Sequence, residues 1–173
     1  MSAADTDGAP PAVIGPWLAE QTGEPGWGDL TVELISGGKS NLTYVVSSPA
    51  GEAVLRRPPT GHILPTAHDM IREATVIGAL GPTGFPVPGI VAVERTGTLV
   101  GQPFYVMERV HGHIIRSELP AGYADTPAER RTLAERLIRT LADLHAFEPA
   151  AIGLGEFGRP TGFMERQVRR WTK

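Results

Sequence analysis

The order of apolar and polar residues along the chain predicts five short strands. Residues 31–36 and 42–47 are apolar and β-branched and lie only five residues apart, which is typical of a hairpin. Three similar runs follow at 53–57, 90–95 and 103–110, each close to a proline or a glycine. Because side chains alternate between the two faces of a strand, each run can direct half of its residues into a core.

Helical patterns precede these strands and also interrupt them. A short helix is expected at 11–21, and a second one at 67–80 with Thr66 as its N-cap. Glu73 lies on or beside the inner face of the second helix. That face has the spacing i, i+4, i+7 and consists of Met70, Ala74 and Ile77.

Two further helices are expected at 127–147 and 163–172. The first has the strongest helical pattern in the chain, and an apolar stripe that predicts core packing is formed by Leu133, Leu137, Leu141 and Leu144. The second contains the basic stretch ERQVRRWTK. Its charges are typical of a solvated helix face around Phe163 and Trp171, rather than of a nucleic-acid contact.

These elements together predict an α+β fold. Residues 31–110 would form a five-stranded antiparallel sheet with one helix between its third and fourth strands. Residues 1–30 would precede it as a disordered start, covering 1–10, and the short first helix. From residue 111 onward we expect a hinge followed by the beginning of a helical region.

Composition narrows the class of protein. The chain has 173 residues, a net charge of −3 and a sequence pI of about 5.9, which disfavours a protein that works by neutralising nucleic-acid phosphates. It has no cysteine, which excludes disulfides and thiolate nucleophiles and fits a cytoplasmic location. We expect no signal peptide and no membrane span.

The glycine-rich stretch Ser36-Gly37-Gly38-Lys39-Ser40-Asn41 resembles the end of a phosphate-binding P-loop. A P-loop needs a glycine five residues before its Gly-Lys-Ser end, and that position is Glu33. A P-loop also leads into a helix, whereas residues after Asn41 predict a strand. The other known phosphate cover of this kind is the glycine-rich hairpin of protein kinases, whose backbone approaches the nucleotide closely.

A kinase-type hairpin predicts further features in a fixed order, and the sequence contains them. A basic residue should lie on the next strand, where Arg56 and Arg57 are both available. A helix should then carry an inward carboxylate, which fits Glu73. A later apolar strand should lead into a hinge that meets the adenine, and this fits residues 108–112.

Four segments in this order resemble the N-terminal lobe of the aminoglycoside phosphotransferase-like family. They are GGKSNLTYVV, VLRRPPTGHILPTAHDMIREATVIGAL, PVPG and GQPFYVMERVHGHI. The chain is most similar to the branch whose members are also found fused to acyl-CoA dehydrogenases. The resemblance covers about residues 13–173. It implies a protein-kinase-like fold and transfer of the ATP γ-phosphoryl group to a hydroxyl of a small molecule.

The resemblance also implies roles for individual residues. The phosphate-covering loop would consist of Gly37, Gly38, Lys39, Ser40 and Asn41. Arg56 matches the strand lysine that contacts the α- and β-phosphates, with Arg57 as the alternative, and Glu73 would pair with the basic residue. Arginine in place of lysine departs from the family pattern, although it can bind phosphate bidentately. The adenine pocket would be lined by Met107, Glu108 and Val110, the last two through backbone groups.

The catalytic part of the family pattern has no match. The family has a His-Gly-Asp-x-x-x-x-Asn loop and a later metal-binding Asp, and neither occurs in these 173 residues. We therefore expect ATP to bind, Mg²⁺ to bind only with a missing C-terminal lobe, and the chain to be inactive alone. The alternative is a non-catalytic nucleotide-binding or interaction module that forms a homodimer through exposed helix faces.

Simpler interpretations stay open for single residues. Gly37–Asn41 could be a plain hairpin turn, because glycine and asparagine favour turns. Glu73 could be a surface carboxylate paired with Arg72. His111 and His113 have the spacing of a metal pair on a strand, but two histidines without a third ligand are weak grounds for a metal site, and we expect none.

Overall fold

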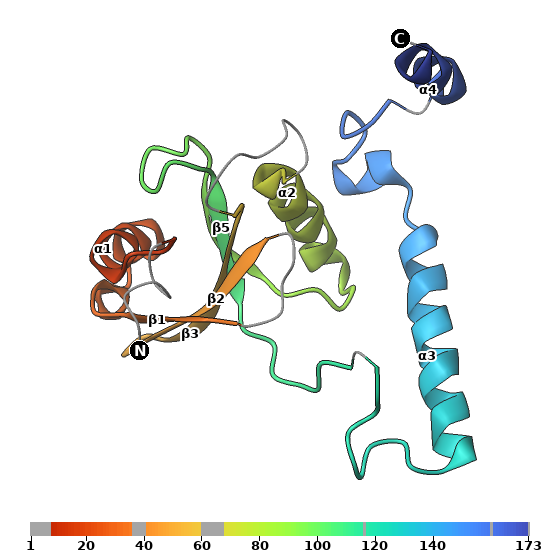
Figure 1. Cartoon of the computed structure of the whole chain (residues 1–173), viewed down its shortest axis with the longest axis horizontal. Helices are drawn as coiled ribbons and strands as arrows, with labels where there is room; N and C mark the ends of the chain where they lie inside the picture. The colour runs from red at the N-terminus through yellow and green to blue at the C-terminus, as the bar shows by residue number, and fades with distance from the viewer. Residues whose placement is uncertain (1–7, 36–40, 60–67, 116, 160, 173) are drawn as a thin grey trace. The chain divides into compact units, whose positions relative to one another are not determined.

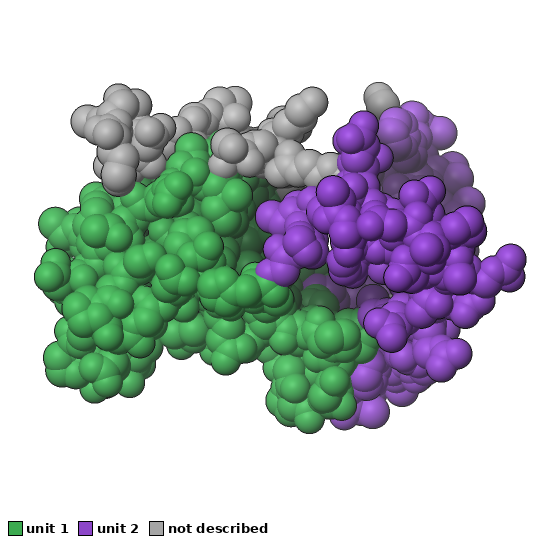
Figure 2. Space-filling view, turned by 90° about the horizontal axis from the view of Figure 1, so that it is seen from below, with its two compact units in different colours: residues 1–111 green, residues 112–173 purple. Residues whose placement is uncertain are grey.

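The computed structural model describes most of the chain, namely residues 8–35, 41–59, 68–115, 117–159 and 161–172. Its internal contacts divide the protein into two compact units, residues 1–111 and residues 112–173. Figure 2 colours these two units separately.

The first unit contains a five-stranded antiparallel sheet with the order β1-β2-β3-β5-β4. Its strands are β1 (Thr31–Leu34), β2 (Leu42–Ser48), β3 (Gly51–Arg57), β4 (Ile90–Glu94) and β5 (Phe104–Glu108). All five predicted strands are present, with ends that differ by one or two residues. The first hairpin is confirmed, since Val32 pairs with Val46 and Leu34 with Tyr44.

One face of the sheet is covered by α1 (Pro11–Thr22) and the short 3₁₀ helix η2 (Pro25–Gly28) (Figure 1). The contact is apolar, because Ile14 and Leu18 of α1 are fully buried against inward residues of the strands. Trp17 adds an edge-on ring contact to Phe104, with ring centroids 4.8 Å apart. Removal of this apolar surface from water is the main stabilisation of the first unit.

The opposite face of the sheet carries α2 (Met70–Leu80) over β4 and β5, on the other side from α1 (Figure 1). Met70 and Ala74 are buried against Tyr105, and Ile77 packs at the edge of this second cluster. The apolar spacing of the helix therefore identified its inner face correctly. A short 3₁₀ helix, η3 (Gly81–Thr83), ends the element.

Two sequence predictions are wrong near these helices. α2 begins at Met70 instead of residue 67, because the Asp69 side chain accepts a hydrogen bond from the Arg72 N–H and caps the helix. Thr66 lies outside the described residues. Disorder over 1–10 does not hold for the described residues 8–10: Ala9 is fully buried, and Pro10 is the N-cap of α1.

The second unit contains α3 (Pro127–His145), the 3₁₀ helix η4 (Pro149–Ile152) and α4 (Phe163–Trp171). Thr126 and Glu129 form a capping box that starts α3, and these hydrogen bonds hold the pKa of Glu129 below its ordinary value. None of the described residues of α3 or α4 is buried. The prediction of core packing for the Leu133–Leu144 stripe is therefore wrong here, since Leu137 is 69% exposed and Leu141 47%.

Among the helices of the described segments, none is long and apolar enough to cross a membrane.

Candidate nucleotide site

The side chains of β3 alternate between the two faces of the sheet. Ala53 and Leu55 point into the core under α1 and are almost completely buried. Arg56 points to the opposite face, toward α2, where its strand partner on β5 is Tyr105. The sheet face that α2 leaves partly open is therefore where a ligand could lie.

Arg56, Glu73 and Tyr105 form a compact polar group on that face. The Arg56 Nη2 lies 3.3 Å from the Glu73 Oε2, and the two side chains are 31% and 36% exposed. The Tyr105 hydroxyl donates a 3.0 Å hydrogen bond to the same carboxylate oxygen. Glu73 is placed for these contacts by its position one turn into α2. The pairing with Arg72 considered for Glu73 is not what the geometry shows.

Tyr105 remains a hydrogen-bond donor at any working pH. Burial raises the pKa of its phenol well above the ordinary value; the Arg56 charge opposes this shift, while Glu73 adds to it. The phenol therefore stays neutral and holds the Glu73 carboxylate in place by donating a hydrogen bond to it.

Arg56 has a donor with no partner among the described residues. Its Nε is buried and makes no hydrogen bond there, while Nη2 is held by Glu73. A buried, unpaired N–H on a cation is costly, and an added oxygen ligand would satisfy it. Guanidinium is also well suited to phosphate, because its donors match two phosphate oxygens.

Arg57 has a different environment, which distinguishes the two arginines. Its side chain is only 3% exposed and lies on the α1 side of the sheet. The guanidinium donates to the backbone carbonyls of Gly8, Pro58 (3.1 Å) and Val100 (3.4 Å). Of the two arginines considered for the strand position, Arg56 is therefore the one that faces Glu73.

Next to Arg56, the open face becomes apolar. Val45 of β2 pairs with Val54 of β3, and Val54 pairs in turn with Met107 of β5. Val54 is 8% exposed, and Met107 is partly buried beside the α2 cluster. Sequence reasoning identified Met107 but missed the two valines. Counting two residues back from Arg56 would have found Val54, since alternate residues share a face.

The predicted hinge residues are only partly available to a ligand. The Glu108 backbone N–H donates to the Gly89 carbonyl (2.8 Å), and its side chain accepts from the Gly89 N–H (2.9 Å). The amide N–H of Glu108 is thus engaged within the protein. Val110 is 72% exposed, and its backbone makes no hydrogen bond to the backbone of another described residue.

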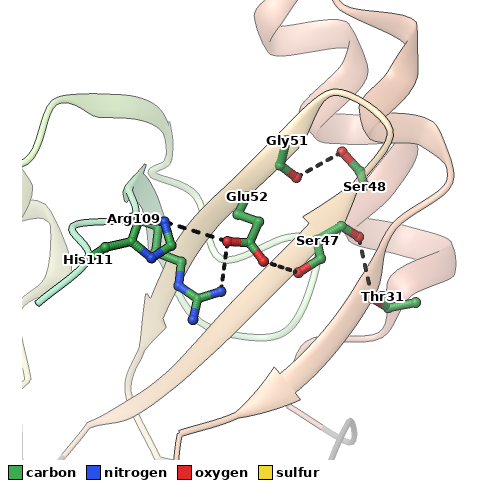
Figure 3. A network of polar contacts seen from close by, with 7 residues as sticks. All are labelled: Thr31, Ser47, Ser48, Gly51, Glu52, Arg109 and His111. Atoms are coloured by element: carbon green, nitrogen blue, oxygen red, sulfur yellow. Dashed lines mark hydrogen bonds and ion pairs between the residues drawn. The ribbon is translucent and has the colours of Figure 1, made fainter.

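A second charged cluster lies at the hinge end of β3 (Figure 3). Glu52 Oε2 lies 2.9 Å from Arg109 Nη1 and 3.7 Å from His111 Nε2, and Ser47 donates to Glu52 Oε1 (3.4 Å). The cluster connects β2 and β3 to the segment after β5. The ring of His113 instead lies tilted against the ring of Tyr123, with centroids 5.1 Å apart. The described residues hold no group of three side chains suited to a metal ion.

Four residues of the predicted phosphate loop, Gly37, Gly38, Lys39 and Ser40, lie outside the described residues. The fifth, Asn41, is described and joins the polar group. Its Nδ2 lies 3.0 Å from Glu73 Oε1, and its Oδ1 lies 2.6 Å from His68 Nδ1. His68 is a neighbour that sequence reasoning missed, because no motif or periodicity marks it.

A model of the phosphotransferase enzyme family matches residues 31–173. The chain belongs to this family. A crystal structure of a candidate aminoglycoside phosphotransferase from Ralstonia eutropha JMP134 has a TM-score of 0.73 to it at 31% identity, over 92% of this chain and 45% of that one. The predicted kinase-like α+β fold is thus confirmed.

The curated relatives are much longer than this phosphotransferase-family chain. Acyl-CoA dehydrogenase family member 11 is 39% identical over 154 residues in Rattus norvegicus and 38% over 144 residues in Homo sapiens, covering 86% and 83% of this chain. Family member 10 of Mus musculus is 33% identical over 136 residues, 79% of this chain. The matched parts are 20%, 18% and 12% of those proteins. The predicted likeness to the dehydrogenase-fused branch is confirmed.

Proposed function

We propose that this chain binds ATP on the open face of its sheet and serves as the nucleotide-binding lobe of a small-molecule phosphotransferase. The observation that carries the proposal is the Arg56–Glu73 pair beside an apolar strip, with a buried Arg56 Nε that has no partner within the described part of the chain. Such a strip suits a purine base, and a cation with spare donors suits a polyphosphate.

Each part of the open face would have a separate task. Arg56 would bind phosphate oxygens while Glu73 fixes the guanidinium, so that little reorganisation is needed when ATP arrives. Val45, Val54 and Met107 would contact the base and exclude water from it. When bound, ATP supplies the phosphoryl group for transfer. That Gly37–Asn41 covers the phosphates of ATP remains a prediction.

Transfer itself would need groups beyond those of this chain. Phosphoryl transfer uses an Asp near the accepting hydroxyl and Asp or Asn ligands for Mg²⁺. The 173 residues lack the family's His-Gly-Asp-x-x-x-x-Asn motif, and the described part holds no metal-binding cluster. We therefore propose that the chain alone binds ATP in the cytoplasm without turning it over. The names of its longer relatives favour a hydroxylated acyl-CoA over an aminoglycoside as acceptor, by analogy alone.

Titration of the chain with ATP tests this proposal. We expect saturable binding in a calorimeter, and at ATP concentrations of about ten times the Kd a stabilisation of about 1.4 kcal/mol. No release of inorganic phosphate above the buffer blank is expected. A folded chain, verified by circular dichroism, that shows neither heat nor a thermal shift at millimolar ATP would contradict the proposal.

A second candidate function, self-association, is favoured by the exposed apolar residues of the second unit. Leu137 and Ile138 of α3 are 69% and 64% exposed, and Trp171 of α4 is 82% exposed. If these faces pair two copies, light scattering should give the mass of a dimer, and Leu137→Glu should return a monomer. A monomer at all concentrations for the unaltered chain would eliminate this candidate.

A further inference from the structure

The side chain of Asn41 is engaged within the protein, which distinguishes it from a residue that binds phosphate directly. It lies at the end of the predicted phosphate loop, yet both of its side-chain polar atoms are engaged with protein side chains, Glu73 and His68. Building on the proposed function, we propose that Asn41 is a positioning residue. It holds the Glu73 carboxylate so that Glu73 can orient Arg56 toward the ATP phosphates.

The chemistry of the partners fixes which way the Asn41 amide points. An ionised carboxylate only accepts hydrogen bonds, so the amide nitrogen must face Glu73 Oε1. The amide oxygen then faces His68, and the 2.6 Å contact requires a proton on His68 Nδ1. His68 then complements the orientation that Glu73 imposes, by donating to the amide oxygen.

The Glu73 carboxylate is held at both oxygens. Asn41 donates to Oε1, while Tyr105 and Arg56 share Oε2. Without Asn41, Glu73 Oε1 would lose the hydrogen bond that Asn41 donates, and the carboxylate could rotate about the bond that joins it to the side chain. Arg56 would then lose its fixed acceptor geometry. The contact also links two segments 32 residues apart in sequence, the β1–β2 connection and α2.

The isosteric variant Asn41→Asp tests this role. It keeps an acceptor for His68 but replaces the donor toward Glu73 with a carboxylate oxygen, which repels Glu73. We expect its Kd for ATP to rise about tenfold while its Kd for adenosine, which has no phosphate, stays within about twofold. The matched control is Thr75→Ala on the exposed side of α2, which should change neither Kd.

The outcomes separate this inference from the proposed function. If the unaltered chain binds no ATP, the proposed function is wrong and the role of Asn41 is wrong with it. If the unaltered chain binds ATP and Asn41→Asp binds it equally well, only the positioning role is wrong. Equal weakening for ATP and adenosine, together with a lower Tm, would indicate a merely structural role and would also overturn the inference.

Asn41 is the only asparagine in the sequence, which allows a direct spectroscopic readout. Selective ¹⁵N-asparagine labelling gives one side-chain amide pair in a proton–nitrogen correlation spectrum. We expect Glu73→Gln to shift this pair, ATP to shift it, and adenosine to leave it in place. A pair that is insensitive to Glu73→Gln would show that the Asn41–Glu73 contact does not exist in solution, and would overturn the inference independently of any binding result.

Discussion

Replacing Arg56 with methionine should raise the Kd for ATP roughly 100-fold, because a charge-assisted phosphate contact is lost. Methionine retains the length and most of the volume of the side chain. The stability of the fold should hardly change, since both partners of the Arg56–Glu73 ion pair are about one-third exposed. Such pairs contribute about 0–1 kcal/mol. Calorimetry measures the Kd and a thermal melt measures the stability.

The matched control for this prediction is Arg56→Lys. Lysine retains the positive charge at this position, and that charge alone should keep ATP binding within about tenfold of the unaltered chain. Methionine and lysine variants that bind ATP equally well would show that the charge of residue 56 has no part in binding.

Replacing Arg57 with methionine should lower stability rather than ATP affinity. We expect it to destabilise the first unit by about 3 kcal/mol. The variant removes a buried cation and leaves carbonyls of Gly8 and Val100 without that donor. For a unit of about this size, the loss lowers the Tm by roughly 15 °C. Below its melting transition, the variant should bind ATP as the unaltered chain does.

Denaturant unfolding measures the effect of Arg57→Met as a change of the midpoint at constant slope. Arg57→Lys is the control, and it should recover only part of the loss. The three N–H groups of an ammonium share one nitrogen, whereas Arg57 contacts its three carbonyls from three different nitrogens. An Arg57→Met variant with unchanged stability would mean that the N-terminal segment at Gly8 is not held by this side chain.

Local patterns in the sequence predicted the sheet, because strand alternation and turn residues are short-range signals. The pairing of Glu73 with a basic residue of β3 was instead implied by the resemblance to the phosphotransferase family. The i, i+4, i+7 spacing identified the buried face of α2. The inward carboxylate at Glu73 followed from the same helix. Strand alternation alone did not decide which arginine of β3 faces Glu73, because Arg56 and Arg57 are adjacent and chemically identical.

The remaining features depend on contacts between distant segments, which local patterns do not report. Burial of Arg57 follows from its contact with Gly8, 49 residues earlier in the chain. His68 reaches Asn41 across 27 residues, and no periodicity marks it. The predicted start of α2 was three residues too early because Thr66 and Asp69 are both favourable N-cap residues, and the structure has Asp69 as the cap.

The location of bound ATP tests the central claim most directly. Backbone and methyl resonances of the isotope-labelled chain, followed during an ATP titration, report which residues contact the nucleotide. We predict that the largest shifts fall on Val45, Val54, Arg56 and Met107, on the open face of the sheet, with little change at Leu18 or Val46 under α1. Saturable shifts confined to the α1 side or to the second unit, or no shifts at millimolar ATP, would contradict the account.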